Sequence, residues 1–159
     1  MIQAITETNL SVTIQTEDNR INTSVASTQI RHLVKFTNDL DKSVYYAYGN
    51  TELIKDRYTQ INISYATPNI YTGHLQLAPA GYWKYEIYEV TWKGTVTVSS
   101  GNAPANEDDV LSPAANDKGV VQGLVTKGKM YLAERNGTEQ VQYTQRQEPS
   151  GTNYIYYGQ

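Results

Sequence analysis

The feature that most constrains the fold is one long run of aromatic and β-branched residues near the middle of the chain. The run follows a turn at Pro79 and Gly81, covers residues 82–92 and contains both tryptophans of the sequence. Side chains of these types favour strands, and at about 3.4 Å per residue the run would span roughly 37 Å. We therefore predict a strand that is long for a globular domain, on which the other strands are arranged.

The bulky side chains of this predicted strand change phase halfway along it. Large residues alternate first on one face and then on the other, in the order Trp83, Tyr85 and Ile87, then Tyr88, Val90 and Trp92. Successive residues of a strand point to opposite faces, so either both faces are covered or a bulge between Ile87 and Tyr88 exchanges them. We expect Tyr88 and Trp92 to be the part of the strand that faces a partner.

The rest of the sequence is also typical of an all-β protein. Tyr, Thr, Gln, Asn and Val are frequent, whereas helix-favouring Leu, Ala, Glu and Lys are sparse. Strand-like segments recur every 8 to 12 residues or so with turns between them, which is typical of a sandwich. Up to residue 99 the predicted strands are 10–16, 30–36, 43–48, 58–65, 71–77, 82–92 and 95–99. Residues 51–56 are predicted to form a single helical turn.

Composition divides the chain into three parts. Residues 1–99 carry the strand pattern and are predicted to form the β-sandwich domain. Residues 100–118 are small, polar and acidic, and are predicted to be a linker or an ordered loop over the surface. Residues 119–159 are predicted to contain a C-terminal β hairpin and arm, in which segments 129–134 and 138–145 pair around an Asn-Gly turn.

The last residues of the sequence form an apolar, tyrosine-rich segment that we expect to be buried against other residues. Tyr154, Ile155, Tyr156 and Tyr157 follow one another close to the last residue. Exposed apolar residues at a chain end are expected to dock, either on their own domain or on a neighbour. An extended segment that adds a strand to another subunit would use its backbone for affinity and alternate tyrosines for specificity.

Charge and composition argue against several classes of partner. The net charge is −3, only 18% of residues are charged, and no block of Lys and Arg occurs, so we expect no nucleic-acid partner and no membrane partner. The sequence has no cysteine, which excludes disulfides, thiol catalysis and Cys-based zinc sites. The first residues do not resemble a signal peptide and no apolar run is long enough to span a bilayer, so a soluble cytoplasmic product is expected.

Residues that could carry chemistry have simpler interpretations. His32 and His74 lie in predicted strands and are expected to be partly buried and hydrogen-bonded. Glu86 and Glu89 have an odd spacing, so they lie on opposite faces and are expected to face solvent or to pair with lysines such as Lys84 and Lys93. No catalytic motif or phosphate loop occurs. We therefore predict no catalytic residue, no cofactor and no metal site, and hence no enzyme.

Two further possibilities remain open from the residues alone. An acidic group in the 100–118 segment could bind calcium through oxygen ligands or could simply be solvated, and comprises Glu107, Asp108, Asp109 and Asp117. A set of tyrosines could stack against sugar rings, or could fill the core and subunit contacts, and comprises Tyr45, Tyr46, Tyr48, Tyr58, Tyr65 and Tyr71. The solvated loop and the contact role are favoured.

Two resemblances bear on the fold and the function. The run Gly81-Tyr82-Trp83-Lys84-Tyr85 resembles the corner that begins the sixth strand of immunoglobulin-like domains, with Trp83 at the place of the corner tyrosine and Tyr85 at that of the cysteine. The missing cysteines exclude an antibody-type domain. More broadly, residues 36–39, 78–86 and 140–159 are similar to small virion proteins of tailed bacteriophages, such as auxiliary or decoration proteins of the head.

The second resemblance implies a non-enzymatic virion structural protein, made in the bacterial host, with an immunoglobulin-like β-sandwich and an extended C-terminal β arm. Its implied partners are the major capsid protein and other copies of the chain. The expected contact residues are Tyr154, Ile155, Tyr156 and Tyr157, then Val110, Leu111, Val120, Val121 and Leu124, and finally Tyr88 and Trp92. Alternatives are a carbohydrate- or receptor-binding module of a phage tail, with surface glycans as partners, or a component of the head-tail junction or tail.

Overall fold

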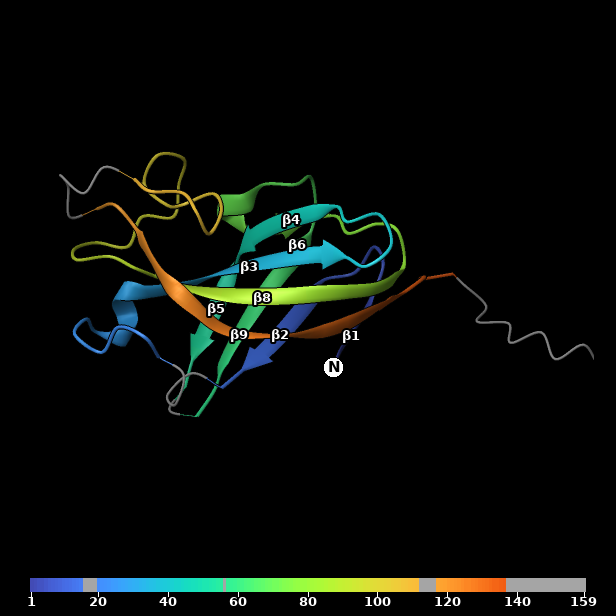
Figure 1. Cartoon of the computed structure of the whole chain (residues 1–159), viewed down its shortest axis with the longest axis horizontal. Coiled ribbons are helices and arrows are strands. Elements are labelled where there is room, and N and C mark those ends of the chain that lie inside the picture. The colour runs from blue at the N-terminus through green and yellow to red at the C-terminus, as the bar shows by residue number, and fades with distance from the viewer. Residues whose placement is uncertain (16–19, 56, 112–116, 137–159) are drawn as a thin grey trace, which may run out of the picture.

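The computed structural model of the chain describes residues 1–15, 20–55, 57–111 and 117–136. These residues form an all-β fold without α-helix, as predicted (Figure 1). The strands are β1 (Ile2–Ile5), β2 (Leu10–Ile14), β3 (Ile30–Asn38), β4 (Val44–Tyr48), β5 (Thr51–Ile54), β6 (Thr59–Tyr65), β7 (His74–Leu75), β8 (Gly81–Thr91) and β9 (Val120–Ala133). Two short 3-10 turns, η1 (Ser27–Gln29) and η2 (Ile70–Thr72), complete the described elements. None of the described residues forms a helix that could cross a membrane.

The strands form two sheets that enclose a common core, and this confirms the predicted sandwich. The larger sheet has the order β1-β9-β8-β3-β4, and the smaller has the order β2-β6-β5 with β7 beside β6. Neighbouring strands are antiparallel except for the parallel pairs β1 with β9 and β6 with β7. Strand β9 therefore lies in the sheet formed by strands of the first 99 residues, although composition places it in a separate C-terminal part.

Strand β8 is the long strand predicted from the aromatic run, and it lies at the centre of the larger sheet. Its pairing with β3 is regular from Ile30 opposite Thr91 to Asn38 opposite Trp83. Its pairing with β9 shifts twice, after Ile87 and after Glu89, and in both places the additional residue belongs to β9. Strand β8 itself contains no extra residue, so its side chains alternate regularly along its whole length. Of the two predicted explanations for the change of phase, cover on both faces of the strand is therefore the correct one.

The inner face of β8 packs in the core between the two sheets. Trp83 is fully buried there, its ring centroid is 5.8 Å from that of Tyr45, and its indole N–H donates to the carbonyl of Pro79 at 3.1 Å. Other members of this core come from both sheets and include Val12, Ile14, Ile61, Ile63, Val34, Phe36, Ile87, Met130 and Leu132. The two sheets are therefore held together by apolar packing around Trp83.

The outer face of β8 is covered near its C-terminal end by the segment that follows it. Leu33, Tyr48, Val90 and Trp92 form a second buried cluster with Ala103, and Val96 and Val98 pack against it. We call residues 95–111 the strap. Residues 95–99 of the strap contribute their valines from a loop, so the strand predicted there is not formed.

Two other local predictions were wrong. Residues 51–54 form strand β5 instead of a helical turn, because Glu52 and Ile54 alternate toward the interior while Leu53 is exposed. Of the predicted strand 71–77, only the two residues of β7 are in a strand, and its first two residues belong to the 3-10 turn η2. The predicted strand 129–134 is present up to Ala133, but it is the end of the longer strand β9, whose extra residues interrupt the alternation. The predicted pairing partner 138–145 lies outside the described residues.

Candidate functional site

The strap is fastened to the outer face of the larger sheet by polar contacts as well as by packing. The Tyr48 hydroxyl donates to the Pro104 carbonyl at 2.7 Å, and burial raises the pKa of this phenol. The Lys118 ammonium donates to the carbonyl of Gly101 at 2.7 Å and to Asn102 Oδ1 at 2.6 Å. Of the two predicted alternatives for the 100–118 segment, its described residues therefore form an ordered loop over the surface.

Glu107 is the main polar attachment of the strap. Its carboxylate accepts hydrogen bonds from the Lys35 ammonium and, at 2.6 Å, from the Tyr46 hydroxyl. The second carboxylate near Lys35 is Glu86, at 3.6 Å. Burial alone would raise the pKa of Glu107, but the bonds from Lys35 and Tyr46 outweigh it and hold the pKa below the ordinary 4.5. Burial and the bond to Glu107 raise the pKa of Tyr46 to about 12.

Acidification is expected to loosen the strap. Because the pKa of Glu107 is lower in the folded state, its stabilising effect is complete above the ordinary value of 4.5 and is lost as the pH falls through the folded value. We expect hydrogen exchange of the strap's backbone amides to become about tenfold faster as the pH falls through this range, after correction for the pH dependence of the intrinsic exchange rates. The reason is the loss of one charge-assisted contact. Hydrogen exchange followed by NMR measures this effect.

The matched controls for this prediction use two neighbouring acids. Glu107→Gln should loosen the strap at neutral pH and remove the acid transition, because the amide forms no ion pair with Lys35. Asp108→Asn should keep the transition, since the Asp108 side chain is exposed. An acid transition that survives in Glu107→Gln would contradict the assignment.

An apolar groove lies where the strap meets the start of β9. It has a volume of about 180 Å³ and is lined by Glu107, Asp109, Val110, Leu111, Gly119, Val120 and Val121. Val110 is 88% exposed and Val120 is 47% exposed, so apolar side chains reach solvent on both sides of the groove. We call Val110, Leu111, Val120 and Val121 the apolar rim. A contiguous exposed apolar surface of this kind is typical of a contact site.

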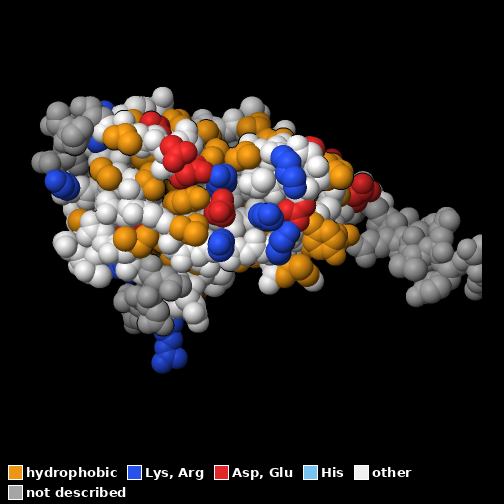
Figure 2. Space-filling view, viewed as in Figure 1, with side chains coloured by type: hydrophobic (Ala, Val, Ile, Leu, Met, Phe, Trp, Pro, Cys, Tyr) orange, Lys and Arg blue, Asp and Glu red, His pale blue; other side chains and the backbone are white. Residues whose placement is uncertain are grey.

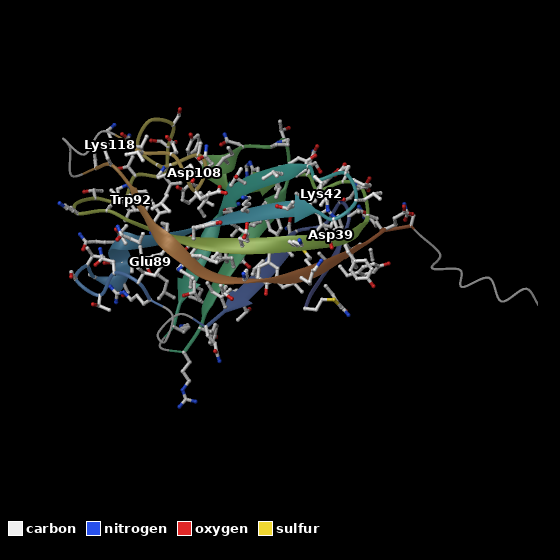
Figure 3. The ribbon with its side chains drawn as sticks, viewed as in Figure 1. Asp39, Lys42, Glu89, Trp92, Asp108 and Lys118 are labelled. Carbon is white, nitrogen blue, oxygen red and sulfur yellow. The ribbon has the colours of Figure 1, made fainter. Side chains whose placement is uncertain are left out.

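The structure brings together four of the residues predicted for contacts, namely those of the apolar rim. Leu124 lies further along β9 and is 41% exposed, and Tyr88 is half-buried on the outer face of β8. Trp92 lies under the strap and is fully buried in the chain's own core, so its side chain offers no surface to a partner (Figure 3). Tyr154, Ile155, Tyr156 and Tyr157 lie outside the described residues, and their contact role stays a prediction.

Two buried polar residues of the sandwich, His32 and Glu89, have internal partners. His32 is 3% exposed and its Nδ1 lies 3.0 Å from Glu52 Oε2, which confirms the prediction of a buried hydrogen-bonded histidine. Glu89 is 1% exposed and accepts the backbone N–H groups of Ile21 and Asn22 at 3.0 and 2.8 Å. The expectation that Glu89 faces solvent or pairs with a lysine was wrong, because it binds the loop after β2 instead.

The structure separates most of the residues that were considered for calcium binding or for sugar stacking. Among the described residues no group of three potential metal ligands comes together, and Glu107 is bound to Lys35. Of the six tyrosines considered for sugar stacking, Tyr45 packs on the inner core, whereas Tyr46, Tyr48 and Tyr71 pack on the outer cluster. These tyrosines therefore do not share one exposed face.

The sequence did not predict a cross-strand group of tyrosines and lysines, which lies on the half of the larger sheet's outer face that the strap does not cover. Tyr82 lies opposite Tyr131 and Lys84 lies opposite Lys129 across β8 and β9. The tyrosine ring centroids are 5.0 Å apart, and Tyr82 is 58% exposed. Alternation places Tyr82 and Lys84 on one face of β8, but their partners are nearly fifty residues away and only the register of the sheet identifies them.

Comparison of the chain with protein-family models, with curated proteins and with solved structures gave no match.

Proposed function

We propose that this chain is a non-enzymatic virion structural protein of the auxiliary (decoration) type, which binds major capsid protein and neighbouring copies of itself. The observation that carries the proposal is the apolar rim. Val110 is 88% exposed although it stands on a folded sandwich beside a groove that Leu111, Val120 and Val121 line together with Glu107, Asp109 and Gly119. Burying such side chains against a partner gains about 25 cal/mol per Å² of apolar surface.

The position of the rim suits docking on a larger assembly. The strap holds Val110 and Leu111 beside the first residues of β9, and the strap itself is anchored by Tyr48 and Glu107. A contact loop fixed in this way loses little conformational freedom when it binds. Repeated weak contacts of this kind add up when many copies sit on one particle.

The strand arrangement supports an immunoglobulin-like sandwich. The larger sheet groups β3, β8 and β9 as the third, sixth and seventh strands of that fold, and the smaller sheet groups β2, β5 and β6 as the second, fourth and fifth. Trp83 bonds to the carbonyl of Pro79, four residues upstream, and thus replaces the backbone contact of the corner tyrosine. A sandwich of this type serves as a rigid frame that presents loops at its ends.

The C-terminal segment supplies the second proposed contact. Residues 137–159 follow β9 and include the sequence Tyr154-Ile155-Tyr156-Tyr157. We propose that this segment acts as an extended β arm that docks on a neighbouring subunit, with its backbone paired to a sheet edge and its tyrosines in pockets.

The test is binding of the purified chain to tailed-phage particles assembled without it. Copies per particle are counted by quantitative mass spectrometry and located by cryo-electron microscopy. Val110→Asp is expected to reduce occupancy at least tenfold, since a charge would enter an apolar contact. Deletion of residues 150–159 should abolish binding.

The matched control is Leu53→Asp, because Leu53 is 44% exposed on strand β5 of the other sheet. Its occupancy should equal that of the unchanged chain. Absence of the unchanged chain from the particles, or equal occupancy of Val110→Asp and Leu53→Asp, would refute the proposed function.

A further inference from the structure

A basic and aromatic patch lies on the half of the larger sheet's outer face that the strap does not cover. Lys84 stands directly opposite Lys129 across β8 and β9. The Lys129 ammonium contacts the Asp39 carboxylate, and the nearby charges of Lys84 and Lys42 also help to lower the pKa of Asp39. Among the described residues, Lys84 and Lys42 form no ion pair of their own. We call Lys42, Lys84 and Lys129 the basic patch, which the Tyr82–Tyr131 pair borders.

This patch is costly for an isolated chain. Like charges directly opposite each other on neighbouring strands destabilise the pair, and one carboxylate is shared among three ammonium groups. The ring of Tyr82 is exposed beside these charges and adds apolar surface to the patch, and contact of apolar surface with water is unfavourable. An acidic group placed over Lys84 would relieve the repulsion.

The same face carries an acidic tip at its other end. Asp108 and Asp109 belong to the strap, and Asp108 is exposed. Asp108 lies close enough to Tyr88, on the outer face of β8, for its charge to help raise the pKa of that phenol. Tyr88 follows Lys84 by four residues, which is about 14 Å along a strand. Figure 3 places Asp108 and the pair Asp39 and Lys42 at opposite ends of the face.

The charges of this face are therefore unevenly distributed along its length. Figure 2 shows acidic side chains over the strap and several basic side chains, with acidic ones among them, toward the other end, and some basic side chains also lie at the strap end. Between them Lys35 contacts both Glu107 and Glu86, so one ammonium stands between two carboxylates and this group belongs to the acidic side of the face. A face with a basic end and an acidic end is complementary to its own copy turned through a half rotation.

We propose that two copies of this chain pair through the outer face of the larger sheet, with the basic patch of each against the acidic tip of the other. The two-fold axis lies in the plane of contact, across the line that joins the two charged ends, so both contacts form at once. This inference rests on the proposed function, because it names the surface through which copies meet, but it is tested on purified protein without particles.

The size of the face fits a stable dimer. Five strands about 4.8 Å apart and the eleven residues of β8 at about 3.4 Å give roughly 24 by 37 Å, or about 900 Å², for the sheet and the strap that lies on it together. This area is an upper bound, because β1 and β4 are shorter than β8. Standard interfaces bury about 800 Å² per partner. Exposed charges set the register of such a contact and make its affinity depend on salt.

The test is the oligomeric state of the full chain by sedimentation equilibrium from about 1 to about 500 µM, covering weak dimers. The unchanged chain should form a dimer that weakens at high salt. Lys84→Glu should raise the dissociation constant about tenfold, because it faces Asp108 of the other copy with a like charge. Lys84→Glu also creates an opposite-charge pair with Lys129, so folding is retained. Asp108→Lys should weaken the dimer to the same extent.

The decisive test of the proposed contact is an equimolar mixture of the Lys84→Glu and Asp108→Lys variants. In the mixed pair both contacts again join opposite charges, so the affinity of the unchanged chain should return. Lys55→Glu, an equal charge change outside this face, is the control and should not weaken the dimer. A chain that stays monomeric throughout, or a mixture without recovery, overturns the proposal. A monomer that binds an anionic polysaccharide resin through Lys84 also overturns it and assigns the patch to an anionic ligand.

Discussion

A chain truncated after residue 99 is expected not to fold, whereas a chain truncated after residue 136 is expected to unfold cooperatively at a nearly unchanged temperature. The reason is strand β9, which lies between β1 and β8 in the larger sheet. It supplies Met130 and Leu132 to the inner core, where both are buried. Without it β8 loses one hydrogen-bonded neighbour along its whole length, and β1 loses the only neighbour that the sheet order gives it.

Circular dichroism and thermal denaturation measure both truncations. The 1–136 chain should melt within about 4 °C of the full chain, equivalent to roughly 1 kcal/mol or less. The 1–99 chain should show no cooperative transition, because the lost packing exceeds the usual margin of stability. A synthetic peptide of residues 117–136 is expected to restore the transition. A cooperative transition in the 1–99 chain alone would contradict the arrangement described here.

Replacing Trp83 with alanine is expected to have the largest effect of any single substitution in the inner core. Trp83 is fully buried, contacts Tyr45 and donates to the Pro79 carbonyl. Truncation of a buried tryptophan costs about 3–5 kcal/mol through lost burial and the cavity that remains. This is a large part of the 5–15 kcal/mol or so that stabilises a typical domain, so most of the cooperative stability should be lost. Chemical denaturation measures the change in the free energy of unfolding.

Two variants separate the parts of this effect. Trp83→Phe keeps a buried ring but loses the hydrogen bond to Pro79, and should cost roughly 1–2 kcal/mol. Tyr82→Ala removes the neighbouring ring, which is 58% exposed, and should cost less than about 1 kcal/mol. If Tyr82→Ala destabilised the chain as much as Trp83→Ala, the assignment of the inner face of β8 would be wrong.

Local patterns identified strands well, because a strand is encoded in a few adjacent residues. The aromatic run predicted β8, and the alternation of Leu10, Val12 and Ile14 predicted β2. The same patterns did not reveal that β8 keeps its phase, since the extra residues at its two register shifts belong to β9. They failed at Glu52, which was predicted to lie in a helical turn but contacts His32 from strand β5.

The candidate surfaces were predictable only where their residues are close in sequence. Val110 with Leu111, and Val120 with Val121, were expected as contact residues, and the strap brings the two pairs to one groove. The opposition of Lys84 to Lys129 depends on the register of β8 and β9, which composition does not encode. Trp92 was expected at a partner surface because the bulky residues of the strand change phase after Ile87, but the strap that buries it follows in the same chain.

The parallel pairing of β1 with β9 has a consequence for how the protein is made. Ile2 in β1 pairs with Met130 in β9, which the ribosome adds more than a hundred residues later. The first strand must therefore wait for most of the chain to be synthesised, about 10 s at typical rates of 5–20 residues per second. Contacts so distant in sequence form slowly. During that interval β1 and β8 present unpaired edges, and we expect nascent chains at high concentration to be most prone to mispairing then.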